Sequence, residues 1–114
     1  MRILLIANTI FEIGIGCLFL FFPTLLLKDN DLSISLLRVI GCSALALGTL
    51  SFLMLSLTTT KELKPGLIAL FTFHALVAIA QFSTFNDGIT NKLVVIVHSL
   101  FAVSFFSVLW KRIS

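Results

Sequence analysis

Apolar residues occupy four long runs of the chain, and most charged residues gather in short segments between them. The runs cover residues 3–27, 32–57, 65–85 and 93–110. A helix needs about 20 predominantly apolar residues to cross the hydrocarbon core of a bilayer, and each run is of that order. Strands of a membrane barrel would be about half as long and would alternate apolar with polar residues. The pattern therefore predicts four transmembrane helices.

The segments between the runs carry the signals of helix ends. Pro23 is expected to end the first helix, with an interfacial turn after it. Asp31 or Ser33 is predicted to cap the second helix, and Asn91 the fourth. Pro65 suits the first turn of the third helix, because its missing N–H would have no partner there.

Short connectors, among them the turn-forming Asn-Asp-Gly at residues 86–88, place successive helices antiparallel. No internal repeat or linker interrupts the chain. We therefore expect an all-α protein with a single domain over residues 1–114, built as an antiparallel four-helix bundle with up-down-up-down order.

Composition agrees with this class. Hydrophobic residues make up 59% of the 114 residues and charged residues 11%, against roughly 45–50% and about 25% in soluble domains. So few charges could hardly cover the surface of a soluble domain of this size. This excludes a soluble enzyme, a secreted disulfide scaffold, a disordered chain and a nucleic-acid-binding module.

Lysine and arginine are distributed unequally between the two ends of the predicted helices. One end carries Lys28 and Lys92, with Arg38 somewhat further inside. The other end carries the larger group, namely Arg2, Lys61, Lys64, Lys111 and Arg112. Positive loops face the cytoplasm, so both termini are predicted to be cytoplasmic. The net charge of +3 follows from this topology and calls for no nucleic-acid partner.

Several polar side chains interrupt the apolar runs. Ionisable groups are costly inside a bilayer, so each is a candidate functional residue. The predicted intramembrane polar network consists of Asn8, Glu12, Arg38, His74, Gln81 and His98.

Glu12 and Arg38 are the charged members of this network. At helical spacing Glu12 shares a face with Asn8 and Gly16, which is expected to point into the bundle. The face of Arg38 is expected to continue through Gly41, Cys42, Leu45 and Gly48. The leading hypothesis is a buried ion pair between the two charges, within one chain or across a dimer. Proton exchange or cation binding at Glu12, and snorkelling of Arg38 to lipid headgroups, remain open.

His74 and His98 differ in predicted depth by roughly 6 Å at 1.5 Å per residue. A histidine in a membrane bundle most often bonds a neighbouring helix. Binding of haem by the two histidines, or a proton relay with Glu12, remains a hypothesis. No metal site is expected, because two ligands are too few for a closed zinc site. Cys17 and Cys42 are isolated and favour no disulfide.

Two family resemblances bear on function. The stretch from Pro23 through Leu36-Leu37-Arg38-Val39-Ile40-Gly41 to Gly48 resembles the small four-helix DoxX-like membrane proteins. The resemblance implies an integral bundle, sometimes attached to membrane redox complexes, with Arg38 as a structural feature. Glu12 within Phe11-Glu12-Ile13-Gly14 is similar to the lone glutamate of the small multidrug resistance transporters, although Arg38 and His74 depart from that family.

The sequence carries no catalytic motif, and no enzyme activity is expected. The leading interpretation is a small multi-pass membrane protein of structural or accessory function, in contact with lipid and either a second copy or a protein partner. The first alternative is a dimeric proton-coupled transporter using Glu12. The second is a membrane redox protein that binds haem or quinone through His74 and His98.

Overall fold

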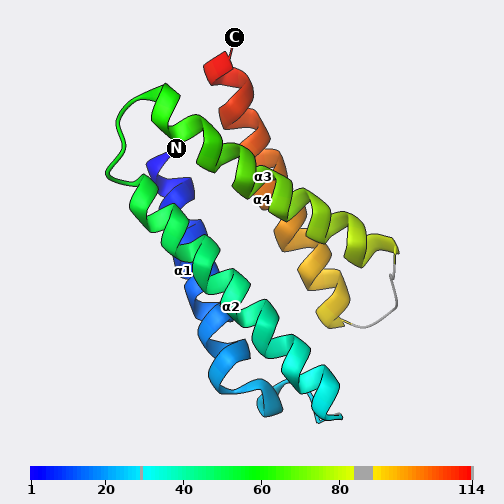
Figure 1. Ribbon diagram of the computed structural model, residues 1–114. Coiled ribbons are helices and arrows are strands. Elements are labelled where there is room, and N and C mark those ends of the chain that lie inside the picture. The colour runs from blue at the N-terminus through cyan, green and yellow to red at the C-terminus, as the bar shows by residue number, and fades with distance from the viewer. Residues whose placement is uncertain (29, 84–88, 114) are drawn as a thin grey trace. The chain divides into compact units, whose positions relative to one another are not determined.

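The computed structural model describes residues 1–28, 30–83 and 89–113, and the regular structure within them is entirely helical (Figure 1). A short 3-10 helix, η1 (Pro23–Leu25), follows the first α-helix. The α-helices of the described residues are α1 (Arg2–Phe21), α2 (Asp31–Met54), α3 (Thr60–Ser83) and α4 (Ile89–Ile113). The predicted all-α fold class is confirmed.

Each of these four helices is long and apolar enough to cross a membrane. The third and fourth begin earlier than the apolar runs suggested, at Thr60 and Ile89 rather than at residues 65 and 93. Helical hydrogen bonding thus continues into the polar segments, where water or headgroups can solvate the charged side chains.

The end of α1 follows the prediction, and the start of α2 differs from it. Pro23 opens η1 directly after α1. The cap of α2 is Asn30, whose side chain accepts a hydrogen bond from the backbone N–H of Ser33 at 2.9 Å. Asp31 is the first residue of the helix, so the predicted cap at Asp31 or Ser33 is wrong by one position or more.

The start of α3 is a capping box that the sequence analysis did not identify. The backbone N–H of Glu62 donates to the Thr59 hydroxyl, and the Thr59 N–H donates to the Glu62 carboxylate, each at 3.3 Å. Pro65 therefore lies inside α3, beyond its first turn. Asn91 lies within α4 and not at its cap. The predicted turn at residues 86–88 lies outside the described residues.

The chain divides into two compact units, one spanning Arg2–Ser56 and the other beginning at Leu57. In the first unit α1 packs antiparallel against α2, and in the second α3 packs antiparallel against α4. Each unit is a helical hairpin. Assembly into a single domain and bundle stays a prediction.

Many large apolar side chains on these helices are exposed. Ile3 is 84% exposed, Ile89 76% and Leu100 64%. A soluble protein rarely leaves contiguous apolar surface of this extent in water. Lipid chains solvate such a surface without penalty, so the exposure pattern supports a membrane protein.

Candidate functional site

Apart from Arg38, the polar side chains of the predicted network fall into two groups, one in each hairpin. In the α1–α2 hairpin, Asn8 and Glu12 are 0% and 1% exposed. In the α3–α4 hairpin, His74 is 0% exposed and His98 is half-buried. Each group joins the two helices of its own hairpin.

Asn8 bonds a residue that the sequence analysis did not single out. Its Nδ2 donates to the hydroxyl of Ser51 at 2.8 Å, and Ser51 is itself 0% exposed. Ser51 lies on α2 at helical spacing from Gly48, so extending the stripe of small residues by one step would have found it. The bond ties the middle of α1 to the last turns of α2.

Glu12 lies near the middle of α1, against Gly48 of α2. A Cβ atom built on Gly48 would stand 3.2 Å from the Glu12 Cβ and 2.7 Å from a side-chain carbon of Ile13. The absence of a side chain at Gly48 thus lets α1 approach α2 closely at the level of the carboxyl group. The predicted inward orientation of Asn8, Glu12 and Gly16 agrees with the burial of all three.

Two further glycines bring the helix backbones together. A Cβ on Gly16 would stand 2.9 Å from the carbonyl oxygen of Gly41, and a Cβ on Gly41 would stand 2.9 Å from that of Gly16. Small residues commonly permit such close contact between membrane helices. Gly16, Gly41 and Gly48 together allow this close approach of α1 and α2.

Arg38 does not join Glu12 within the α1–α2 hairpin. The buried stripe of α2 contains Gly41, Ala44, Gly48 and Ser51, whereas Arg38 and Cys42 are exposed. Glu12 lies against Gly48, which places it about 15 Å from Arg38 along α2 at 1.5 Å per residue. The predicted buried pair is therefore not formed in this hairpin.

The register of the hairpin explains the position of Arg38. Gly41 lies against Leu20, near the end of α1. Arg38 is almost one turn nearer the start of α2, and so is level with the end of α1 and the beginning of η1. Arg38 is thus exposed near one end of the hairpin, and its snorkelling to lipid headgroups stays a prediction.

His74 and His98 are in direct contact. Their Nδ1 atoms are 2.8 Å apart, and their ring centroids are 4.9 Å apart. The expected difference in depth disappears because α3 ends at Ser83 and α4 begins at Ile89, which places both histidines equally far from the connecting segment. The contact is a hydrogen bond between the two imidazole rings.

Phenylalanine rings surround this imidazole pair. His74 stacks on Phe101 with centroids 4.8 Å apart and on Phe105 with centroids 5.8 Å apart. Phe73 presents an edge-on contact to both histidine rings. The pair thus lies among aromatic rings, where the low local polarity strengthens a hydrogen bond between imidazoles.

The contact does not fit a metal ion or haem iron held between the two Nδ1 atoms. Metal–imidazole bonds of about 2.0–2.1 Å would place two tetrahedral ligands about 3.3 Å apart and two opposite ligands about 4 Å apart. The observed separation of the Nδ1 atoms is 2.8 Å. No group of three or more His, Cys, Asp or Glu residues suited to a metal occurs among the described residues.

Gln81 bonds across the same hairpin. Asn91 Nδ2 donates to the side-chain oxygen of Gln81 at 2.9 Å and lies 3.4 Å from its backbone carbonyl oxygen. Asn91 was expected to act as a helix cap, so its role as a cross-helix donor was missed. Asn91 can bond Gln81 because α4 begins before Asn91, which places this residue inside the helix and not at its cap.

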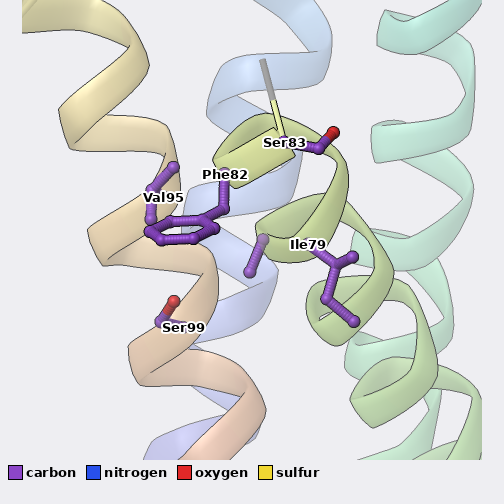
Figure 2. A pocket seen from close by; sticks show the side chains of 6 residues that line it. Ile79, Phe82, Ser83, Val95 and Ser99 are labelled. Atoms are coloured by element: carbon purple, nitrogen blue, oxygen red, sulfur yellow. The ribbon is translucent and has the colours of Figure 1, made fainter. Parts of the chain in front are cut away.

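A shallow groove of about 330 Å³ is lined by residues of α3 and α4 (Figure 2). Figure 2 shows Phe82 and Val95 side by side in its wall, with Ser99 further along α4. The groove is lined by Ala78, Ile79, Phe82, Ser83, Val95 and Ser99. The Ser83 hydroxyl donates to the carbonyl of Ala80 in its own helix. The groove therefore suits hydrocarbon and lacks the convergent polar groups typical of a cofactor site.

No protein-family model, no curated protein and no solved structure matches this chain. The class of the protein therefore rests on the structure itself. It is a small all-α protein whose described residues form four helices able to span a membrane. The likeness to DoxX-like proteins stays a prediction.

Proposed function

We propose that this chain is a multi-pass integral membrane protein of accessory function, with both termini in the cytoplasm. The proposal is supported by the hydrogen bonds that the polar side chains of the apolar helices make. They bond helix to helix in the contacts Asn8–Ser51, His74–His98 and Gln81–Asn91. Bonds of this kind stabilise membrane helix pairs by about 0.6–2 kcal/mol each.

The outer surfaces of the hairpins leave room for a partner in the membrane. Val39 and Leu76 are each 60% exposed, and Leu100 is 64% exposed. An accessory protein would present such faces to another membrane protein as well as to lipid. In this proposal the polar side chains stabilise the hairpins, and the exposed apolar faces bind the partner protein.

Site-specific photo-crosslinking in native membranes tests this assignment. A photoreactive residue at position 39, 76 or 100 is expected to crosslink to a distinct protein of defined mass. The same residue at position 70 is the matched control, because Leu70 is 0% exposed. Crosslinks to lipid alone from all three exposed positions would contradict the accessory role.

Proton-coupled transport by a dimer is the second candidate, and the position of Glu12 favours it. The carboxyl group is buried near the middle of α1, one helical turn from Asn8, whose neutral side chain bonds Ser51. A carboxyl group in such surroundings is suited to binding and releasing a proton during a transport cycle.

Proton flux in proteoliposomes separates the two candidates. A transporter would move protons with its substrate, and Glu12→Gln would abolish this flux while the fold persists. Asp31→Asn is the matched control, because Asp31 is exposed at the start of α2. Flux through the wild-type chain that Glu12→Gln abolishes and Asp31→Asn retains would replace the accessory proposal with the transport proposal.

A further inference from the structure

The His74–His98 contact places a constraint on the protons of the two rings. Their Nδ1 atoms are 2.8 Å apart. A neutral imidazole carries one proton, so one of its nitrogens donates while the other accepts. Two bare Nδ1 atoms would repel at this distance, and two Nδ1–H groups would clash. One proton therefore lies between the rings, and a neutral pair combines one Nδ1-protonated with one Nε2-protonated histidine.

We propose that the His74–His98 pair is a binding site for a single additional proton inside the α3–α4 hairpin. The Nδ1-protonated histidine has a lone pair at Nε2, which accepts the incoming proton. The resulting imidazolium donates from Nδ1 to its neutral neighbour. Such a charge-assisted hydrogen bond is roughly twice as strong as the neutral one that it replaces.

The unequal burial of the rings assigns their roles. His98 is half-buried and His74 is 0% exposed, so the proposal places exchange with the surroundings at His98. In the neutral pair His98 donates from Nδ1 to His74, and His74 carries its proton on Nε2. After uptake at His98, transfer of the Nδ1 proton moves the positive charge onto His74, and release follows the same steps in reverse.

The neighbouring rings suit a cation at His74. Phe101 and Phe105 stack on it at interplanar angles of 22° and 17°. The faces of aromatic rings attract a cation electrostatically. The other titratable residues with described side chains on α3 and α4 lie towards the helix ends, namely Lys61, Glu62, Lys64, Lys92 and Lys111.

The same geometry limits uptake to one proton. A second proton would place an N–H group on both Nδ1 atoms, which face each other at 2.8 Å. The rings would have to separate, and the α3–α4 contact would open at this level. This inference is independent of the proposed accessory role, since it concerns only the chemistry of the histidine pair.

Nitrogen NMR of the full chain in lipid nanodiscs tests the proposal directly. The protein contains only two histidines, so ¹⁵N-histidine labelling reports on this pair alone. At neutral pH we expect one ring of each tautomer, with a coupling between the two Nδ1 atoms across the hydrogen bond. Acidification should add one proton to the pair while the coupling persists, and a second proton should abolish it.

Two rings of the same tautomer that titrate independently and show no coupling would overturn the proposal, as would a coupling that survives uptake of two protons. His98→Gln should lose the coupling signal. Asn91→Ala is the matched control, because it removes the hydrogen bond to Gln81 in the same hairpin and should keep the signal. The wild-type spectra decide the question even if His98→Gln fails to fold.

Discussion

Gly16 and Gly41 lie face to face in the α1–α2 hairpin. A Cβ atom on either glycine would stand 2.9 Å from the carbonyl oxygen of the other. Real Cβ atoms essentially never approach other atoms so closely. The backbones of α1 and α2 can therefore remain in contact only while both positions lack a side chain.

Gly16→Ala and Gly41→Ala should each destabilise the hairpin. The added methyl group meets backbone atoms that cannot rotate away, and overpacking of this kind costs about 1–3 kcal/mol. Gly14→Ala is the control, because a Cβ there meets nothing within 4 Å, and it should leave stability unchanged or raise it. Thermal unfolding in lipid nanodiscs measures the difference. Equal effects at positions 14, 16 and 41 would contradict the packing.

Ser51→Ala should lower the free energy of unfolding by about 1–2 kcal/mol, because it removes the hydroxyl that accepts a hydrogen bond from the buried amide of Asn8. Ser43→Ala is the matched control on the same helix. Ser43 is exposed and its hydroxyl bonds the Val39 carbonyl of its own helix, so its removal should have little effect. If the two variants were equally stable, the contribution of the Asn8–Ser51 bond would be refuted.

Glu12→Gln and Arg38→Leu should act independently on the stability of a monomeric hairpin. The register separates the two residues by about 15 Å along α2, and substitutions so far apart usually add within about 0.5 kcal/mol. A double-mutant cycle in monomeric protein gives the coupling energy. A coupling energy clearly above about 0.5 kcal/mol would instead support the predicted ion pair within the chain.

Topology can be measured by labelling introduced cysteines with a membrane-impermeant reagent. Both termini are proposed to be cytoplasmic, so Lys61→Cys should react only after the membrane is opened, and Lys28→Cys should react from outside. Both positions are exposed in the structure. The opposite labelling pattern would overturn the orientation.

Hydropathy was sufficient to locate the helices, because each span needs a long apolar segment whatever its neighbours. It could not give the helix ends. The capping box of Thr59 and Glu62 extends α3 into a charged segment that hydropathy excludes. In addition, α4 begins earlier than predicted. His98 therefore lies at the same depth as His74, and the two rings are in contact.

Hydropathy could not predict that Arg38 is exposed, for a different reason. In a soluble protein apolar residues mark the inner face of a helix, but in a membrane both lipid and protein contacts are apolar. The inner face of α2 is instead marked by small residues, Gly41, Ala44 and Gly48 among them. Arg38 lies at a helical angle close enough to that stripe to be assigned to it, and only the packing register shows it to be exposed.

Disulfide crosslinking in native membranes tests the α1–α2 register most directly. Cys17 and Cys42 are free and would first be replaced by alanine. Asn8→Cys with Ser51→Cys should then crosslink readily, because those side chains are in contact in the hairpin. Glu12→Cys with Arg38→Cys should not crosslink within a chain. Efficient crosslinking of positions 12 and 38, with none between 8 and 51, would contradict the register and the role that it gives to Glu12 and Arg38.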